Sequence, residues 1–229
     1  MSSEDRSPNS DWDAYAARWS GLHGGFDPRT ASPVVRGWLR IAHRVACRLA
    51  ALRVGPGAVT AFGVVLGGLV PVAALGGGGW VLGAAALVGL GALADTVDGA
   101  LAVVSDRVSA RGTVYDSVAD RLTEAAWLVA FWVVGAPGWL VALCGAVAWL
   151  HEYVRARATV AGMPDIGTVT VAERPTRVLV SLFGLAATAG AALADPDLGP
   201  GAATGAVAIW AVLGAAGLLH LTATVRAAL

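Results

Sequence analysis

The sequence predicts an all-α, polytopic membrane protein in which six transmembrane helices follow a cytoplasmic, interfacial amphipathic helix. The first observation is the composition: 56% of the 229 residues are apolar and 14% are charged, whereas soluble domains carry about 25% charge. The second is that six apolar stretches are long enough to cross a bilayer, which takes about 20 residues each. The third is that arginines occupy alternate connections between these stretches. The net charge of +0 argues against a nucleic-acid partner.

Three segments of different character follow one another along the chain. Residues 1–33 are polar, and we assign them no role. Residues 34–54 are expected to form the interfacial helix, because one face is basic and another is apolar at helical spacing. The basic face comprises Arg36, Arg40, Arg44 and Arg48, and the apolar face comprises Trp38, Ile41, Val45, Leu49 and Leu52. Residues 55–229 are expected to form a six-helix transmembrane catalytic domain.

The connections between the six stretches indicate an orientation. Three of the connections contain no arginine, and the others, together with the chain ends, contain several. By the positive-inside rule the arginine-bearing side is cytoplasmic, so we expect a multi-pass protein of the cell (plasma) membrane with both termini in the cytoplasm. The expected spans cover residues 57–78, 80–104, 113–134, 139–157, 176–194 and 202–224.

Four aspartates stand at the cytoplasmic ends of the second and third expected spans. Asp95 and Asp98 are three residues apart, and Asp116 and Asp120 are four apart, so each pair shares one helix face. A short connection makes these two helices antiparallel neighbours, so the four carboxylates should converge. Bare carboxylates in a membrane are costly, and one or two divalent cations would neutralise them. The pattern therefore predicts a metal site.

A cation- or proton-coupled transporter also uses intramembrane carboxylates. Such a protein is expected to hold them near the bilayer midplane, whereas these four lie at helix ends. Their position favours a metal-dependent enzyme, and the transporter stays as the alternative.

The frame Asp95-x-x-Asp98-Gly99-x-x-Ala102, followed by Gly112-x-x-x-Asp116-x-x-x-Asp120, resembles the signature of the CDP-alcohol phosphatidyltransferases. The resemblance implies transfer of a phosphatidyl group from CDP-diacylglycerol to an alcohol, with release of CMP, in phospholipid biosynthesis by a homodimer in the lipid bilayer. It further implies two Mg²⁺ or Mn²⁺ ions on the four aspartates, with Asp120 as general base. The residues implied to bind the CDP-lipid are Gly57, Ala58, Val59, Thr60, Gly99, Ser109 and Gly112. Val103 stands where the family has arginine, which leaves a catalytically silent relative as a further alternative.

Four arginines near one cytoplasmic mouth form a candidate acceptor site: Arg155, Arg157, Arg174 and Arg177. Guanidinium groups bind phosphate through paired hydrogen bonds, so the acceptor is expected to be phosphorylated. The two segments that carry these arginines are similar to the actinobacterial phosphatidylinositol phosphate synthases, which implies inositol phosphate as acceptor, with glycerol phosphate next. The alternative, in which the arginines only set the orientation in the membrane, stays open.

Overall fold

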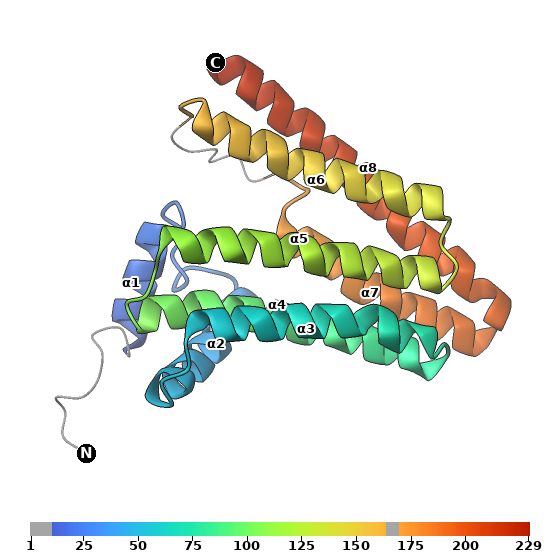
Figure 1. Cartoon of the computed structure of the whole chain (residues 1–229), viewed down its shortest axis with the longest axis horizontal. Helices are drawn as coiled ribbons and strands as arrows, with labels where there is room; N and C mark the ends of the chain where they lie inside the picture. The colour runs from blue at the N-terminus through green and yellow to red at the C-terminus, as the bar shows by residue number, and fades with distance from the viewer. Residues whose placement is uncertain (1–10, 164–169) are drawn as a thin grey trace. The chain divides into compact units, whose positions relative to one another are not determined.

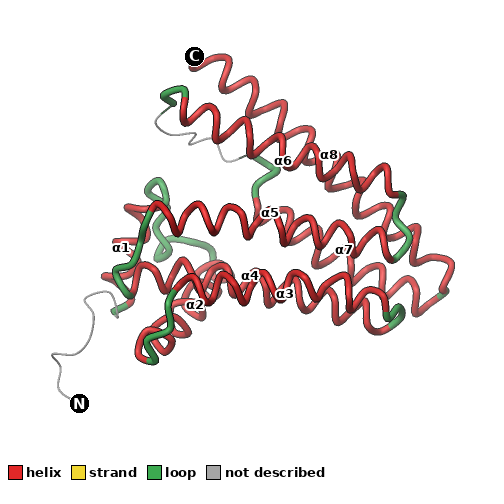
Figure 2. Tube along the Cα trace, viewed as in Figure 1, coloured by secondary structure: helices red, strands yellow, loops and turns green. Residues whose placement is uncertain are grey.

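The computed structural model describes residues 11–163 and 170–229, and within these ranges every regular element is helical (Figures 1 and 2). The predicted all-α class is confirmed for this part of the chain. The elements are α1 (Trp12–Leu22), α2 (Pro33–Ala51), α3 (Pro56–Leu75), α4 (Gly79–Val104), α5 (Ala110–Val133), α6 (Gly138–Val160), α7 (Arg174–Ala194), a short 3₁₀ turn (Pro196–Leu198) and α8 (Gly199–Ala228).

The six expected spans coincide with α3 to α8, and each end lies within four residues of the helix end. Between α3 and α4 the chain turns through Gly77 and Gly78, whose φ angles of 62° and 47° lie in the region that glycine adopts without a steric penalty. Pro175 lies in the first turn of α7, where its missing N–H costs no intrahelical hydrogen bond.

Four helical segments are long and apolar enough to cross a membrane: Pro56–Leu75, Gly79–Val104, Arg174–Ala194 and Pro196–Ala228. Helices α5 and α6, with 24 and 23 residues, are as long as these four segments require, but both carry several ionisable side chains. Those of α5 include two aspartates and a glutamate, and those of α6 include a histidine, a glutamate and two arginines. Half of the eight predicted metal and acceptor residues lie on these two helices, Asp116 and Asp120 on α5 and Arg155 and Arg157 on α6.

The N-terminal segment contains a helix that the polar sequence of residues 1–33 did not lead us to expect. Asp11 caps α1 by accepting hydrogen bonds from the backbone N–H groups of Asp13 and Ala14. Ser32 caps α2 in the same way, accepting from Val35 N at 3.4 Å. Each hydroxyl or carboxylate cap satisfies backbone donors that the first helical turn leaves free.

The chain divides into two compact units. The first combines the chain up to Val64 with Gly91–Asp120, and the second combines Val65–Leu90 with Arg121–Leu229. In the second unit α8 packs against α6 and α7, around buried side chains that include Trp127, Phe131 and Leu185. A Cβ on Gly217 of α8 would lie 2.3 Å from the Cβ of Ala172, so this close approach requires glycine.

Candidate metal centre and arginine cluster

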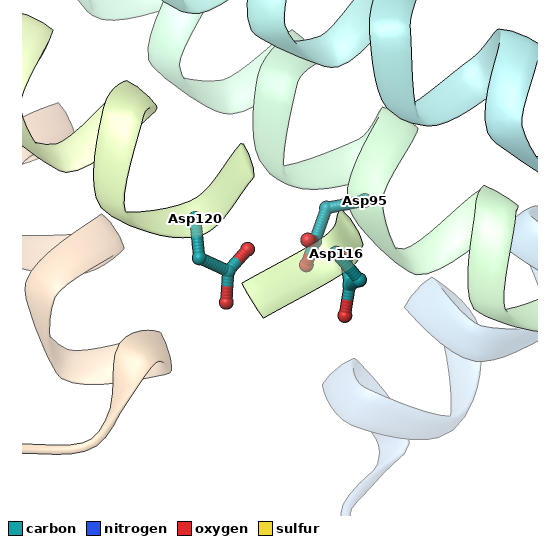
Figure 3. A group of neighbouring side chains, drawn as sticks. All are labelled: Asp95, Asp116 and Asp120. Carbon is teal, nitrogen blue, oxygen red and sulfur yellow. The ribbon is translucent and has the colours of Figure 1, made fainter. Parts of the chain in front are cut away.

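Three of the predicted metal ligands gather in the first unit. Asp95 comes from α4, and Asp116 and Asp120 come from successive turns of α5 (Figure 3). One carboxylate oxygen from each of the three lies within 4.8 Å of the others, and all three residues are partly buried. Two oxygens on one divalent cation are at most about 4–5 Å apart at the usual bond lengths of 2.0–2.6 Å. The spacing therefore suits a hard divalent cation.

Asp98 lies beside this group rather than within it. Its side chain is 6% exposed, Thr60 hydrogen-bonds to it, and Asp95 and Asp116 are its charged neighbours. Its Oδ2 atom has no hydrogen-bond partner among the residues that the structure describes. A buried carboxylate oxygen without a partner is costly, and a cation would supply the missing interaction. The donor chemistry of all four aspartates thus fits a divalent metal.

The residues expected to bind the CDP-lipid also lie in the first unit. Gly57, Ala58, Val59 and Thr60 open α3, where Val59 is buried and Thr60 half-buried, while Gly99 follows Asp98 on α4. Ser109 precedes α5 and accepts a hydrogen bond from Gly112 N at 3.1 Å, so these two residues shape the start of the helix that carries Asp116. Val103 is 2% exposed.

Arg177, in the second unit, belongs to a buried network of ion pairs. Its side chain is 2% exposed, and Nη1 donates to both oxygens of Glu124 at 3.1 Å while Nη2 donates to Glu152 at 2.7 Å. Arg121 also donates to Glu124, at 2.9 Å, and Arg174 Nη1 lies 4.0 Å from the same carboxylate. Arg177 is thus held between two carboxylates inside the unit.

Arg155 occupies a different environment from Arg177. It forms an ion pair with Glu173, whose Oε1 also accepts from the backbone N–H and the hydroxyl of Thr170, each at 3.1 Å. Thr170 in turn contacts the fully buried His151, with 3.0 Å between the hydroxyl and Nε2. Arg155 Nε is buried and has no acceptor in the described part of the chain, whereas Arg157 is exposed.

Several residues of this ion-pair network were not among the site residues predicted from the sequence. Arg121 and Glu124 are three residues apart on α5, a spacing that signals a helical ion pair. No local pattern joins Glu124 to Arg177, which is 53 residues away. The pairing arises only when α5 and α7 pack together.

The comparison with known proteins identifies the family. The family model of CDP-alcohol phosphatidyltransferase matches residues 53–220. The chain belongs to this family. The resemblance drawn from the aspartate frame is therefore confirmed, and the match includes every predicted metal ligand and all four candidate acceptor arginines.

Two curated proteins are similar to this chain over part of their length. The phosphatidylinositol phosphate synthase of Corynebacterium glutamicum is 35% identical over 118 residues, which cover 48% of this chain and 53% of the relative. The archaetidylinositol phosphate synthase of Pyrococcus horikoshii is 33% identical over 95 residues, which cover 41% and 50%. The chain thus spans about half the length of these curated relatives.

A solved structure extends the likeness to the fold. The crystal structure of Mycobacterium tuberculosis phosphatidylinositol phosphate synthase with CDP-DAG bound superimposes with a TM-score of 0.63 at 25% identity. The superposition covers 81% of this phosphatidyltransferase-family chain and 94% of the other.

Proposed function

We propose that this protein transfers a phosphatidyl group from CDP-diacylglycerol to a hydroxyl group of an inositol phosphate and releases CMP. The observation that carries the proposal is the gathering of Asp95, Asp116 and Asp120 oxygens within 4.8 Å, in a chain of the CDP-alcohol phosphatidyltransferase family. Two relatives named for the synthesis of inositol phosphate lipids support the acceptor class.

In this mechanism the aspartates hold the reacting groups in place. Asp95, Asp98, Asp116 and Asp120 would hold one or two Mg²⁺ or Mn²⁺ ions, which when bound neutralise the diphosphate and polarise its phosphorus. Asp120 accepts the proton from the attacking hydroxyl group. The acceptor oxygen then forms a bond to the phosphatidyl phosphorus as the bond to CMP breaks. The donor is bound by the start of α3 (57–60) and by Gly99, Ser109 and Gly112.

The acceptor phosphate is assigned to the arginines of the second unit. Four arginines there lie within 4.0 Å of three glutamates, an excess of one positive charge, and the exposed Arg157 adds another: the four are Arg121, Arg155, Arg174 and Arg177, against Glu124, Glu152 and Glu173. Because the glutamates hold the guanidinium groups in fixed orientations, the cluster is organised before an anion arrives. Arg155 Nε, which has no acceptor in residues 11–163 and 170–229, is a donor that a phosphate oxygen would satisfy.

We further propose the membrane arrangement that the sequence predicts. It comprises a polar segment over residues 1–33, an interfacial helix within 34–54 and six spans within 55–229, in a homodimer of the cell membrane with cytoplasmic termini. On α2, Trp38 is 37% and Ile41 48% exposed, and Leu52, which follows the helix, is 73% exposed. Apolar side chains left open beside exposed arginines suit a helix that lies on an anionic membrane surface.

Release of CMP by the purified full chain tests the proposal. With CDP-diacylglycerol and Mg²⁺, inositol phosphate should support turnover and unphosphorylated inositol should not. Asp116→Asn should lower kcat by orders of magnitude, because the metal loses a charged ligand, whereas the exposed Asp197→Asn should not. Equal use of both acceptors would refute the acceptor assignment. Binding of CDP-diacylglycerol without CMP release from any alcohol would instead indicate a catalytically silent relative.

Two arginine variants separate an acceptor site from a purely topological role. Arg155→Gln should raise KM for inositol phosphate while KM for CDP-diacylglycerol stays within twofold of wild type. Arg226→Gln, near the C-terminus, is the matched control and should change neither constant. If Arg155→Gln affects both substrates alike, Arg155 does not bind the acceptor.

A further inference from the structure

Helix α1 lies ahead of the residues that the family model matches. The family match begins at residue 53, whereas α1 covers Trp12–Leu22 and belongs to the same compact unit as the metal-binding aspartates. Its side chains Tyr15 and Ala16 are fully buried and Trp19 is 9% exposed. A helix buried to this extent is a docked part of the unit.

The contact of interest joins Trp19 to Gly99. Two atoms of the Trp19 six-membered ring, Cζ3 and Cη2, lie 3.8 Å from the position that a Cβ of Gly99 would take. Gly99 comes four residues after Asp95 on α4, so the two residues share a helix face. The indole ring therefore covers the turn of α4 that continues the metal-binding face.

This distance leaves no room for a ring between the two residues. A Cβ lies about 1.5 Å from Cα, so Trp19 is about 5 Å from the backbone of Gly99. A flat group placed between them needs two van der Waals separations of about 3.5–4.0 Å each, or about 7–8 Å. With α1 docked, the open side of Gly99 is closed to a nucleotide base.

Two further sets of contacts hold α1 in this position. Arg18 forms an ion pair with Asp106, in the connection that follows α4. The other set joins α1 to α2: the ring of Trp12 lies 5.7 Å from that of His43 and 5.3 Å from the Arg40 guanidinium, and Tyr15 lies 4.5 Å from His43. The ion pair is exposed, with 43% and 71% of the two side chains accessible, and such pairs contribute little free energy. Movement of α1 away from α4 therefore breaks this weak ion pair, the Trp19 contact and the ring contacts of Trp12 and Tyr15 with α2.

We propose that α1 is an autoinhibitory cap, which closes the donor side of the metal site when docked and must move away before the cytidine end of the CDP-lipid reaches Gly99. The inference rests on the proposed function, because it takes a CDP-linked lipid as the donor. It adds a regulatory element that precedes the matched family region.

Binding of CDP-diacylglycerol in mixed micelles with Mg²⁺, measured on the full chain, tests the cap. If the open state is at most about 10% populated, removing the cap should tighten the apparent Kd by about tenfold or more. Trp19→Ala should do so, and Arg18→Ala should shift Kd in the same direction. Arg29→Ala is the matched control, because the Arg29 side chain donates to the carboxylate of Asp27, two residues away in the same loop, and it should leave Kd unchanged.

A reversible covalent tether holds α1 in the docked position, which is the opposite of what Trp19→Ala should do. This test does not depend on whether the Trp19→Ala variant folds stably. Arg18→Cys and Asp106→Cys, in a background with Cys47→Ala and Cys144→Ala, can be joined by a bis-maleimide that contains a reducible disulfide. The joined protein should bind CDP-diacylglycerol at least tenfold more weakly than the same protein after reduction.

The possible outcomes distinguish failure of the cap proposal from failure of the proposed function. If the joined and reduced proteins bind the donor equally, or if Trp19→Ala weakens binding, α1 is no cap and the proposed function stands. If neither wild type nor any variant binds CDP-diacylglycerol, both proposals are overturned. Tighter binding by Trp19→Ala together with weaker binding by the joined protein supports the cap.

Discussion

Replacing Arg177 with methionine should destabilise the second unit strongly. The guanidinium is 2% exposed and donates three hydrogen bonds to Glu124 and Glu152. Methionine fills part of the volume but offers no donor. Glu124, itself 1% exposed, then keeps Arg121 as its nearest cation and loses both bonds from Arg177.

The expected magnitude follows from the cost of removing one partner of a buried ion pair, about 3–5 kcal/mol. For chains of about 150–250 residues, 1 kcal/mol corresponds to about 2–4 °C in Tm, so the predicted loss is about 6–20 °C. Arg157→Met removes an exposed arginine and should lower Tm by no more than about 2 °C. Because both substitutions replace an arginine of the second unit with methionine, the comparison isolates burial and pairing.

Thermal unfolding in a mild detergent, followed by loss of the monodisperse peak in size-exclusion chromatography, measures these shifts. The double variant Arg177→Met with Glu124→Gln should lose less than the sum of the single losses, since the residues share an interaction. A Tm for Arg177→Met within 2 °C of wild type would contradict the buried network. Additive losses would show that the two side chains do not act on each other.

Three further outcomes follow from other parts of the structure. Gly217→Ala should lower Tm by several degrees, because the new Cβ would overlap that of Ala172. Gly205 has open space around it, so Gly205→Ala should leave Tm unchanged or raise it. Equal effects of the two substitutions would contradict the packing of α8. Excess EDTA should abolish CMP release and added Mg²⁺ or Mn²⁺ should restore it, because a divalent cation neutralises the four neighbouring carboxylates. Full activity in the presence of the chelator would exclude the metal site. Desolvation lowers the pKa of His23, whose ring stacks on Trp19 at the end of α1, so the unfolded segment binds more protons and the end of α1 should become less stable as the pH falls below about 6.5. Hydrogen exchange of α1 should report this change, and His23→Asn should remove it, whereas pH-independent exchange in wild type would contradict it.

The sequence determined helices α2 to α8 and the spacing of the four aspartates. Apolar stretches of about 20 residues located α3 to α8 to within four residues, because the length and composition of such a stretch can be read from the chain itself. The i,i+4 spacing of Asp116 and Asp120 fixed them on one face of α5, since that relation depends only on helix geometry. These properties are local, and a local pattern is sufficient to predict them.

Tertiary packing decided which side chains meet. The spacing placed Asp95 and Asp98 together, yet the rotation of α4 brings only Asp95 into the group with Asp116 and Asp120 and leaves Asp98 beside it. Arg177 and Arg155 look alike in the sequence, but Arg177 is enclosed by two carboxylates, whereas Arg155 has a buried Nε without an acceptor among the residues that the structure describes. Helix α1 docks through Trp12, Tyr15 and Trp19, whose partners lie on α2 and α4. Contacts between residues distant in the chain depend on how helices rotate and pack, and no local pattern of one helix specifies them.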